Sequence, residues 1–548
     1  METFLKNICR ICAPYTPLLL ATGIVAALCL FGEPLYQGND DPGLAMVGAG
    51  FGEALKPEPF LIWSHLGYGL ILVALSRLIG PNAHGWFTVF SVWLSLTLII
   101  RACLSAKNLL VGLSVFMVCF GCIFLTALLA AEFTITAGLL FGAAMAHWLV
   151  FSEPDRPQSR PWGLAWVAAF LLAYLIRPES FFMGLLIAAP LIVFLCWRRT
   201  KARVRARVLA SGLALIVVFG WTEKIAYWSS ARWRDAPEYM DLLTQFAMYD
   251  RVPYVVQAPE YQQIGWTRND YDMFGEWYTL DPIFSRANLS FLLERLGKPL
   301  FTTSELWGWF RLPCDSWPLL LSLGAQLIIC VVLDRLQRVQ AILLVLGEIA
   351  AIAAVALTGR EPLDYVWETA ASITLLTLSA LLVANPPRKR LLANSGSTMI
   401  GFLGIIASAL VYADHLAVCH QAADYRRWIN QQIGLRHGKV TAWGTGLIWE
   451  WLVTPTRIYS PFPELKMAVI DDLGCTPVEE DMLKSLQIDN LAKTLGTDPD
   501  MHLICPIRNK QFLVRFCEEH FGISPRFKEE ARWEDSAIYS LDQQGGQE

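Results

Sequence analysis

Long apolar segments recur along most of this 548-residue chain. A helix needs roughly 17 to 25 such residues to cross the hydrocarbon core of a bilayer. Charged residues make up only 17% of the chain, well below the usual fraction in a soluble domain. The sequence therefore predicts a mainly α-helical, polytopic membrane bundle of eleven spanning helices, at 14–32, 84–101, 109–130, 133–151, 162–177, 180–197, 207–224, 318–334, 340–357, 367–384 and 398–414.

Basic residues identify the expected cytoplasmic side of the bundle. Short loops rich in Arg and Lys follow every second predicted helix, at 101–107, 155–160, 198–207, 334–338 and 388–390. The positive-inside rule places these loops in the cytoplasm. Counting the apolar segment 58–80 as a further span would export the basic loop at 198–207. We therefore predict that 44–57 and 58–80 form helices within the first outer loop, at the membrane interface.

Two adjacent acids, Asp40 and Asp41, stand in that first outer loop, within the stretch GEPLYQGNDDPG. Neighbouring carboxylates at a membrane surface repel each other and lose hydration, so such a pair indicates a functional role. A single acid among turn-forming residues would instead be typical of a solvated loop. The distribution of the other charges favours the functional interpretation.

Further charged residues are predicted at the same membrane face, while the helices between them are nearly free of charge. They are Lys56, Glu132, Arg177 and Glu179 of the turn RPES, and those of the turn GREPLDYVWE at 359–368. Charged groups at helix ends are costly unless they line a wet cavity. The alternative is a set of structural ion pairs, for example between Arg177 and either Glu179 or Glu132.

The long outer loop at 225–317 is rich in aromatic residues and predicts short amphipathic helices. Its rings could anchor in the lipid headgroup layer, which is the favoured interpretation, or stack on sugar faces. The rings are those of Trp228, Trp233, Tyr239, Tyr249, Tyr254, Tyr261, Trp266, Tyr271, Trp277 and Tyr278.

The tail at 415–548 predicts a small extracytoplasmic α/β domain. Strand-like segments at 438–446, at 501–506 and around 536–541 alternate with helical ones. The glycine pair at 444–446 is too short to indicate a phosphate-binding loop. No chemistry is assigned to this domain. The predicted division is a transmembrane domain at 1–414, whose first outer loop is 33–83, followed by the tail.

This arrangement resembles the GT-C class of membrane glycosyltransferases, in which an acidic motif follows the first helix. Asn39-Asp40-Asp41 resembles the acidic motif of the arabinofuranosyltransferase branch, and Glu132 has the position of the second acid, after the third helix. The segment 225–317 matches the long loop after the seventh helix. The protein-mannosyltransferase branch carries a His-Pro-Pro-Leu helix where this chain has His65 without Pro-Pro. No WWD-type tripeptide of the oligosaccharyltransferase branch is present.

The resemblance implies an inverting glycosyltransferase that moves a sugar from a polyprenyl-phosphate donor to a hydroxyl of a glycan, lipid or protein. Its site and C-terminal domain would face the periplasm at the bacterial inner membrane. Asp41 is expected as the base with Asp40 assisting, or the reverse. Glu132 would hold the acceptor, act as second acid or bind a metal. Arg177, Lys56 and Arg251 are expected to bind the donor phosphate. Glu179, His65 and Tyr365 are expected to contact the substrate.

No cofactor or metal is expected, because Arg and Lys alone can hold a leaving phosphate. A calcium or magnesium ion bound by three carboxylates is the alternative. A transporter or flippase of lipid-linked sugars would also place ionisable residues in a membrane cavity, although no internal repeat is found. An O-antigen polymerase or ligase shares the substrate class. Membrane lipids are expected partners, whereas the absence of a basic stripe argues against nucleic acid.

Overall fold

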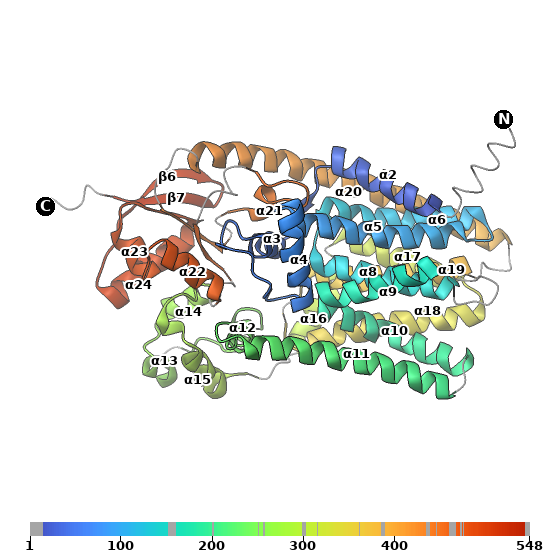
Figure 1. The fold of residues 1–548 in the computed structure, drawn as a ribbon, viewed down its shortest axis with the longest axis horizontal. Coiled ribbons are helices and arrows are strands. Elements are labelled where there is room, and N and C mark those ends of the chain that lie inside the picture. The colour runs from blue at the N-terminus through green and yellow to red at the C-terminus, as the bar shows by residue number, and fades with distance from the viewer. Residues whose placement is uncertain are drawn as a thin grey trace.

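The structure of the protein is a computed structural model with an elongated helical bundle and an α/β region at one end (Figure 1). It describes residues 15–151, 160–199, 202–249, 251–255, 258–298, 303–314, 316–360, 362–384, 390–433, 439–444, 447–459, 467–471, 474 and 476–542. The predicted fold class, a helical membrane bundle with a small C-terminal α/β domain, is confirmed.

All eleven apolar segments coincide with helices, one of them interrupted by a π-helical turn. The helices are α2 (Thr16–Phe31), α5 (Ala83–Leu104), α6 (Leu109–Cys119) continued by η2 (Phe120–Phe124) and α7 (Leu125–Leu129), α8 (Phe133–Phe151), α9 (Arg160–Ile176), α10 (Pro178–Arg199), α11 (Ala202–Ser229), α17 (Trp317–Val332), α18 (Arg335–Ala356), α19 (Asp364–Ala384) and α20 (Arg390–Ile433). Among the described residues, seven helices are long and apolar enough to cross a membrane, or eight if one bent pair counts as a span. Helices α2 and α9 are apolar but shorter.

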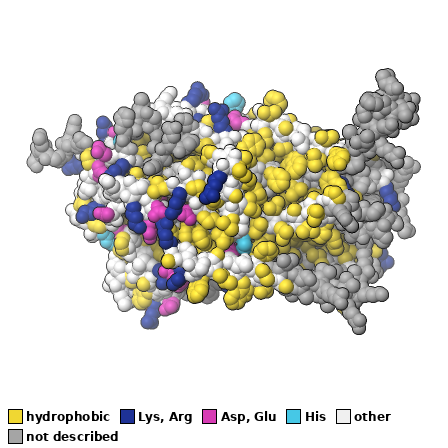
Figure 2. Space-filling view, viewed as in Figure 1, with side chains coloured by type: hydrophobic (Ala, Val, Ile, Leu, Met, Phe, Trp, Pro, Cys, Tyr) yellow, Lys and Arg dark blue, Asp and Glu magenta, His cyan; other side chains and the backbone are white. Residues whose placement is uncertain are grey.

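The surface of the bundle is apolar, whereas the surface of the α/β region is charged. Figure 2 shows hydrophobic side chains over the bundle, and Lys, Arg, Asp and Glu concentrated at the other end. Large apolar side chains such as Leu30, Phe31 and Leu109 are more than 70% exposed. An apolar surface of this extent on long helices identifies a face that lies in lipid.

The first outer loop crosses the end of the bundle instead of spanning it. Its helices are α3 (Asp40–Ala49) and α4 (Leu66–Ile79), and α4 runs across the bundle axis in Figure 1. With 14 residues, α4 is about 21 Å long and too short to span. The predicted bounds 44–57 and 58–80 are wrong, because Gly50 adopts φ 74° and ends α3. The side chain of His65 caps α4 by accepting a hydrogen bond from Gly67 N–H at 3.0 Å.

The α/β domain contains a five-stranded sheet of order β4-β3-β5-β7-β6, with β3 parallel to β4 and β5. The predicted strands are β3 (Lys439–Trp443), β5 (Met501–Pro506) and β7 (Ser536–Leu541). Two strands were not predicted, β4 (Met467–Ile470) and the largely exposed β6 (Phe527–Trp533). The helices are α21 (Trp449–Leu452), α22 (Pro477–Ser485), α23 (Leu491–Thr497) and α24 (Ile507–Phe521).

Two connections join this domain to the bundle. Helix α20 has 44 residues, about twice the length needed to cross a bilayer, so it continues from the bundle through residue 414 into the domain. The long loop supplies the second connection, through short helices that include α12 (Ala236–Ala247), α13 (Pro259–Gln263), α14 (Arg268–Gly275), α15 (Arg286–Leu296) and α16 (Thr303–Arg311).

The long loop and the α/β domain share one hydrophobic core. Tyr261, Trp266 and Tyr278 are each no more than 3% exposed and pack in a cluster that also contains Trp443 and Phe516. For these three rings the prediction of headgroup anchoring is wrong, because they bury their area against the domain. The domain is thereby held over the end of the bundle.

Candidate active site

A two-residue parallel ladder brings the predicted acids together. Strand β1 (Leu35–Tyr36) pairs with β2 (Ala130–Ala131), and Gln37 N–H donates to the carbonyl of Ala131 at 2.9 Å. The acidic doublet follows β1, and Glu132 follows β2 directly. Segments 95 residues apart in sequence therefore meet at the end of the bundle, as the position of the acids predicted.

Asp41 is buried in a hydrogen-bond network and is 1% exposed. Its Oδ1 lies 2.8 Å from His84 Nε2, and its Oδ2 accepts from Phe133 N–H at 3.3 Å. The other ring nitrogen of His84 lies 2.7 Å from the hydroxyl of Tyr68. Burial, and then the charge of Asp40, raise the pKa of the Asp41 carboxyl well above its ordinary value. Both oxygens of Asp41 are thus occupied by partners from the protein.

Asp40, by contrast, is exposed and faces a cavity at the start of α3. Its place in the first turn lets the helix dipole stabilise the carboxylate. Partial desolvation by the walls of the cavity raises the pKa of Asp40, while the charges of Arg177 and Arg360 oppose that shift. Of the two acids, Asp40 is the one that a ligand in the cavity can reach.

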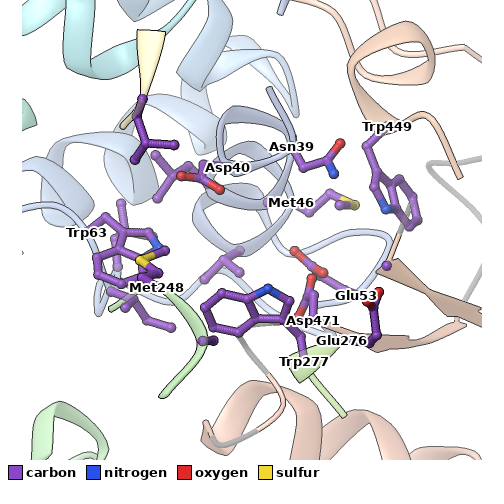
Figure 3. A pocket seen from close by; sticks show the side chains of 18 of the residues that line it. Asn39, Asp40, Met46, Glu53, Trp63, Met248, Glu276, Trp277, Trp449 and Asp471 are labelled. Carbon is purple, nitrogen blue, oxygen red and sulfur yellow. The ribbon is translucent and has the colours of Figure 1, made fainter. Parts of the chain in front are cut away.

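The cavity has a volume of about 490 Å³ and lies between the bundle and the α/β domain. Its bundle wall consists of Asn39, Asp40, Gly43, Leu44, Met46 and Val47 of α3 and its N-cap, with Arg360, Leu363 and Tyr365. Its domain wall consists of Glu276, Trp277, Gly444, Trp449, Asp471 and Arg508. The remaining lining is Glu53, Phe60, Leu61, Ile62, Trp63, Ala247 and Met248. Figure 3 shows Asp40 on one side of this space and Trp277, Glu53 and Asp471 on another.

Glu132 lies behind the bundle wall and is 7% exposed. Its Oε2 accepts from Ile135 N–H at 2.6 Å, which caps the N-terminus of α8. Burial and the charge of Asp41 raise the pKa of Glu132 to about 8. It is not among the residues that line the cavity, so its observed contacts are those of a helix cap beside Asp41.

Arg177 is likewise buried behind this wall, at 4% exposure. Its guanidinium donates to the carbonyl of Trp63 at 2.9 Å and lies 3.3 Å from Glu179 Oε2. It also lies over the ring of Phe133, at 4.9 Å from the centroid. The ion pair with Glu179, predicted as the structural alternative, is therefore present. Arg177 also interacts electrostatically with Asp40.

Arg360 is the cationic residue on the bundle wall, and it was not singled out from the sequence. One Nη donates to the hydroxyl of Tyr365 at 2.5 Å. Its Nε is buried without a hydrogen-bond partner among the described residues. A guanidinium on a cavity wall suits an anionic ligand. The only sequence signal was its place in the turn at 359–368.

The other predicted ligands lie outside the cavity lining. Lys56 is 55% exposed and pairs with Glu58 at 3.3 Å and with Asp481 at 3.6 Å. Arg251 donates to the side chain of Gln245 at 2.8 Å. His65 Nε2 lies 3.2 Å from the carbonyl of Phe219 and so ties α4 to α11. Each side chain has a partner that accounts for its position.

The contribution of the α/β domain was missed altogether. Gly444 follows β3 at φ 55°, a left-handed conformation that favours glycine. Trp277 adopts φ 65°, which is rare for a bulky residue and stores strain. Arg508 forms an ion pair with Glu276. The sequence did not predict this wall, because its residues come from separate segments between 276 and 508.

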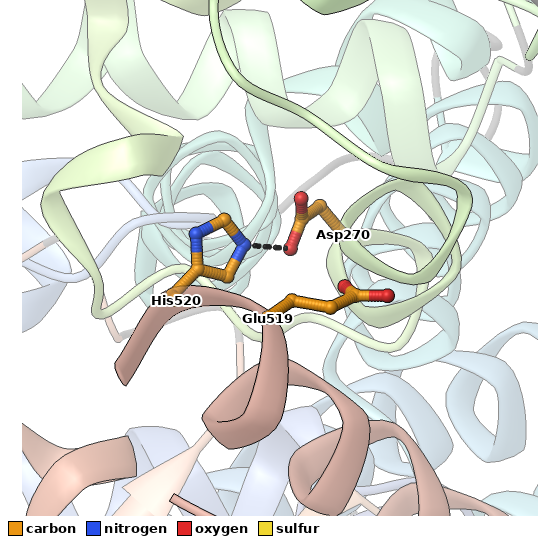
Figure 4. Close-up of side chains that lie close together, drawn as sticks. All are labelled: Asp270, Glu519 and His520. Atoms are coloured by element: carbon orange, nitrogen blue, oxygen red, sulfur yellow. Dashed lines mark hydrogen bonds and ion pairs between the residues drawn. The ribbon is translucent and has the colours of Figure 1, made fainter. Parts of the chain in front are cut away.

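One cluster among the described residues has the spacing of a metal site. Ligand atoms of Asp270, Glu519 and His520 lie within 4.8 Å of one another (Figure 4). The Asp270 carboxylate, however, accepts from Thr267 N–H at 2.7 Å and lies 2.9 Å from His520 Nε2. Because these carboxylate contacts cap α14 and tie it to α24, the cluster is first of all a structural link.

Two solved structures similar to this chain are crystal structures of ArnT from Cupriavidus metallidurans, one bound to undecaprenyl phosphate and one in the apo state. The first is 13% identical, with a TM-score of 0.43 over 97% of this chain and 99% of that chain. The second is 12% identical, with a TM-score of 0.42 over 96% and 98%. No family profile and no curated protein matches the chain. A likeness of this degree carries no argument about activity.

Proposed function

We propose that this protein is a glycosyltransferase that moves a sugar from a polyprenyl-phosphate donor to a hydroxyl acceptor. The observation that carries the proposal is the cavity of about 490 Å³ at the end of a lipid-facing bundle, with Asp40 and Arg360 on the same wall. The volume falls in the usual range of ligand sites. A lipid substrate can approach along the bundle, while a water-soluble one can approach from the α/β domain.

Asp40 is the base in this proposal, the reverse of the order favoured from the sequence. It accepts the proton of the acceptor hydroxyl while the acceptor oxygen forms a bond to the anomeric carbon. The bond from that carbon to the donor phosphate breaks, and its electron pair passes to the phosphate. A single base without a covalent intermediate inverts the anomeric centre. A raised pKa makes Asp40 a stronger base near neutral pH.

Arg360 binds the donor phosphate through its guanidinium, which lines the cavity. Tyr365 holds the guanidinium in place through its hydroxyl. Arg177 acts through space, since its charge reaches Asp40 from behind the wall. The cations thus stabilise the charge that develops on the leaving phosphate.

Asp41 and Glu132 are positioning residues in this mechanism. Asp41 fixes the start of α3 against His84 and Phe133, and Glu132 caps the helix that carries Phe133. The network therefore fixes the direction in which the neighbouring Asp40 points. Groups held by buried hydrogen bonds lose little energy to reorganisation during the reaction.

The rival function, a transporter, would place its substrate near the middle of the membrane. A second cavity, lined by Thr126, Ser322 and Glu368, does lie within the bundle. Its volume is about 20 Å³, which suits a single water molecule and no sugar. The larger cavity at the end of the bundle therefore favours transfer over transport.

The test uses the full chain in nanodiscs with a panel of radiolabelled undecaprenyl-phosphate sugars and a cell-envelope glycan fraction. Wild-type protein should move label to the glycan and release undecaprenyl phosphate. Asp40→Asn should reduce transfer by roughly two orders of magnitude while the protein remains folded. Asp364→Asn is the matched control, since Asp364 is exposed at the start of α19 outside the cavity lining. Full activity of Asp40→Asn would overturn the assignment of the base.

A further inference from the structure

The small cavity inside the bundle has no part in the proposed transfer. Its volume of about 20 Å³ gives room for one occupant of the size of a water molecule. It lies between η2 and α7 on one side and α8, α17 and α19 on the others. Four residues of its lining carry oxygen atoms in their side chains, namely Thr126, Ser322, Glu368 and Ser372.

Two hydroxyl groups of this lining form no hydrogen bond within the described part of the chain. They are the Oγ of Ser322, a residue that is 3% exposed, and the Oγ1 of Thr126, and both oxygen atoms are buried. A buried polar group without a partner is costly, and inside a membrane bundle no bulk water can satisfy it. Two such oxygens at one small cavity therefore indicate an occupant that supplies the missing interactions.

The wall that carries Thr126 also has an unusual backbone. The π-helical turn η2 spans Phe120–Phe124, and its residues Cys122 and Ile123 line the cavity. Turns of this kind are rare, and they occur frequently at functional sites. The position of the turn is thus an observation, independent of the hydroxyls, that this part of the bundle binds a ligand.

The carboxylate of Glu368 determines the charge of the occupant. Its Oε2 accepts a hydrogen bond from the side-chain amide of Gln37 at 3.3 Å, and the charge of Asp364 repels it. No Lys or Arg pairs with Glu368 among the described residues. Glu368 lies in the second turn of α19, whereas a helix dipole acts mainly in the first. A carboxylate in a bundle without a cationic partner is costly, and a bound cation removes that cost.

We propose that this cavity binds one dehydrated monovalent cation, Na⁺ or K⁺, through Glu368 and the hydroxyls of Thr126 and Ser322. Divalent cations do not fit, because Ca²⁺ takes about six to eight oxygen ligands and Mg²⁺ keeps several of its waters. The site also supports the larger cavity, since Gln37, which is bonded to Glu368, stands between β1 and Asp40. The inference goes beyond the proposed transfer and does not depend on it.

The test is binding of radioactive Na⁺ to the full chain in phosphatidylcholine nanodiscs, with choline chloride to keep the ionic strength constant and empty nanodiscs as the blank. Wild-type protein should bind one Na⁺ per chain saturably, and unlabelled K⁺ should compete, whereas Mg²⁺ should not. The absence of saturable binding would overturn the proposal and leave the cavity to a water molecule beside a protonated Glu368. Competition by Mg²⁺ as strong as that by K⁺ would contradict it as well.

Variants tie the binding to the cavity. Glu368→Gln should abolish it, because the amide keeps the shape of the carboxylate without its charge, and Ser322→Ala should weaken it about five-fold. The matched control is Glu348→Gln. Glu348 is also a buried acid of the bundle, at 2% exposure, but it accepts from Gln326 at 3.4 Å and lies outside the cavity lining.

Unchanged Na⁺ binding in folded Glu368→Gln or Ser322→Ala protein, or its loss in Glu348→Gln, would place the ion elsewhere and refute the site. If Glu368→Gln does not fold, Ser322→Ala alone decides the question. Binding is measured without a sugar donor, so a failure of the proposed transfer leaves this result unaffected.

Discussion

The bundle wall and the domain wall hold their carboxylates in different ways. Behind the bundle wall, Asp41 and Glu132 are less than 10% exposed and are fixed by backbone N–H groups and a histidine. On the domain wall, Glu276 pairs with Arg508, whose side chain is 67% exposed. Buried networks fix geometry, which a reacting group requires, whereas partly exposed pairs can exchange partners when a polar ligand binds.

The two arginines that line the cavity give the largest expected contrast. Arg360→Ala should weaken binding of undecaprenyl phosphate roughly 10- to 100-fold, because a charged hydrogen bond in an enclosed site is lost. Arg508→Ala should leave that affinity unchanged, since Arg508 belongs to the opposite wall and pairs with Glu276. Arg360→Lys should recover part of the affinity, as it keeps the charge without the fork geometry. Isothermal titration in nanodiscs measures all three.

Equal losses in the Arg360 and Arg508 variants would show that the two walls do not separate the two substrates. A loss in Arg177→Ala accompanied by a lower melting temperature, with Arg360→Ala unaffected, would return the phosphate role to Arg177. A lower melting temperature of Arg177→Ala is expected in any case, because the substitution removes the ion pair with Glu179.

The second contrast compares neighbouring acids. Asp41→Asn should keep the fold, because the amide has the shape of the carboxyl and its oxygen can still accept from the Phe133 N–H. Transfer should fall by much less than in Asp40→Asn. Asp41→Ala leaves His84 and the Phe133 N–H without their hydrogen-bond partner, which costs about 1 to 3 kcal/mol for each buried group. Thermal unfolding followed by tryptophan fluorescence should show a lower midpoint for Asp41→Ala than for Asp41→Asn.

A larger loss of transfer in Asp41→Asn than in Asp40→Asn, at an unchanged melting temperature, would restore Asp41 as the base. The control is Asp364→Asn, which should match the wild type in both measurements.

Much of the bundle was predictable from sequence, since apolar length and loop charge act locally along the chain. The acids stood out for the same reason, because each lies in the loop that follows an apolar segment. What sequence did not reveal depends on packing between distant segments. The choice between Asp40 and Asp41 is set by His84 of α5. Arg360 reaches the cavity because the turn before α19 lines the same space as α3.

The domain wall was the least predictable part. Gly444 and Trp277 stand 167 positions apart, and neither belongs to a recognisable motif. Their role emerges only when the long loop packs on the sheet through buried rings such as Tyr278 and Trp443. The same aromatic residues that suggested headgroup anchors in the sequence are what holds this wall in place.

The smallest expected effect concerns the link between α14 and α24, which supports the domain wall from outside. The hydrogen bond to Asp270 and its charge, with those of Glu519 and Asp281, raise the pKa of His520 above 6.5. The folded protein therefore binds this proton more tightly than the unfolded chain. The stabilisation is fully present below the unfolded pKa near 6.5, and it is lost as pH rises through the raised folded pKa.

Melting curves between pH 5.5 and about pH 9 should thus show a small decrease in the midpoint that is absent in His520→Gln. Melting curves with added Zn²⁺ distinguish an ion pair from a metal site at Asp270, Glu519 and His520. A metal needs neutral His520, so zinc would raise the midpoint mainly at high pH, where the ion pair is weakest. A structural pair alone gives the same curve with zinc or with chelator. A zinc-dependent rise that His520→Gln abolishes would replace the ion pair by a metal as the group that holds the domain wall.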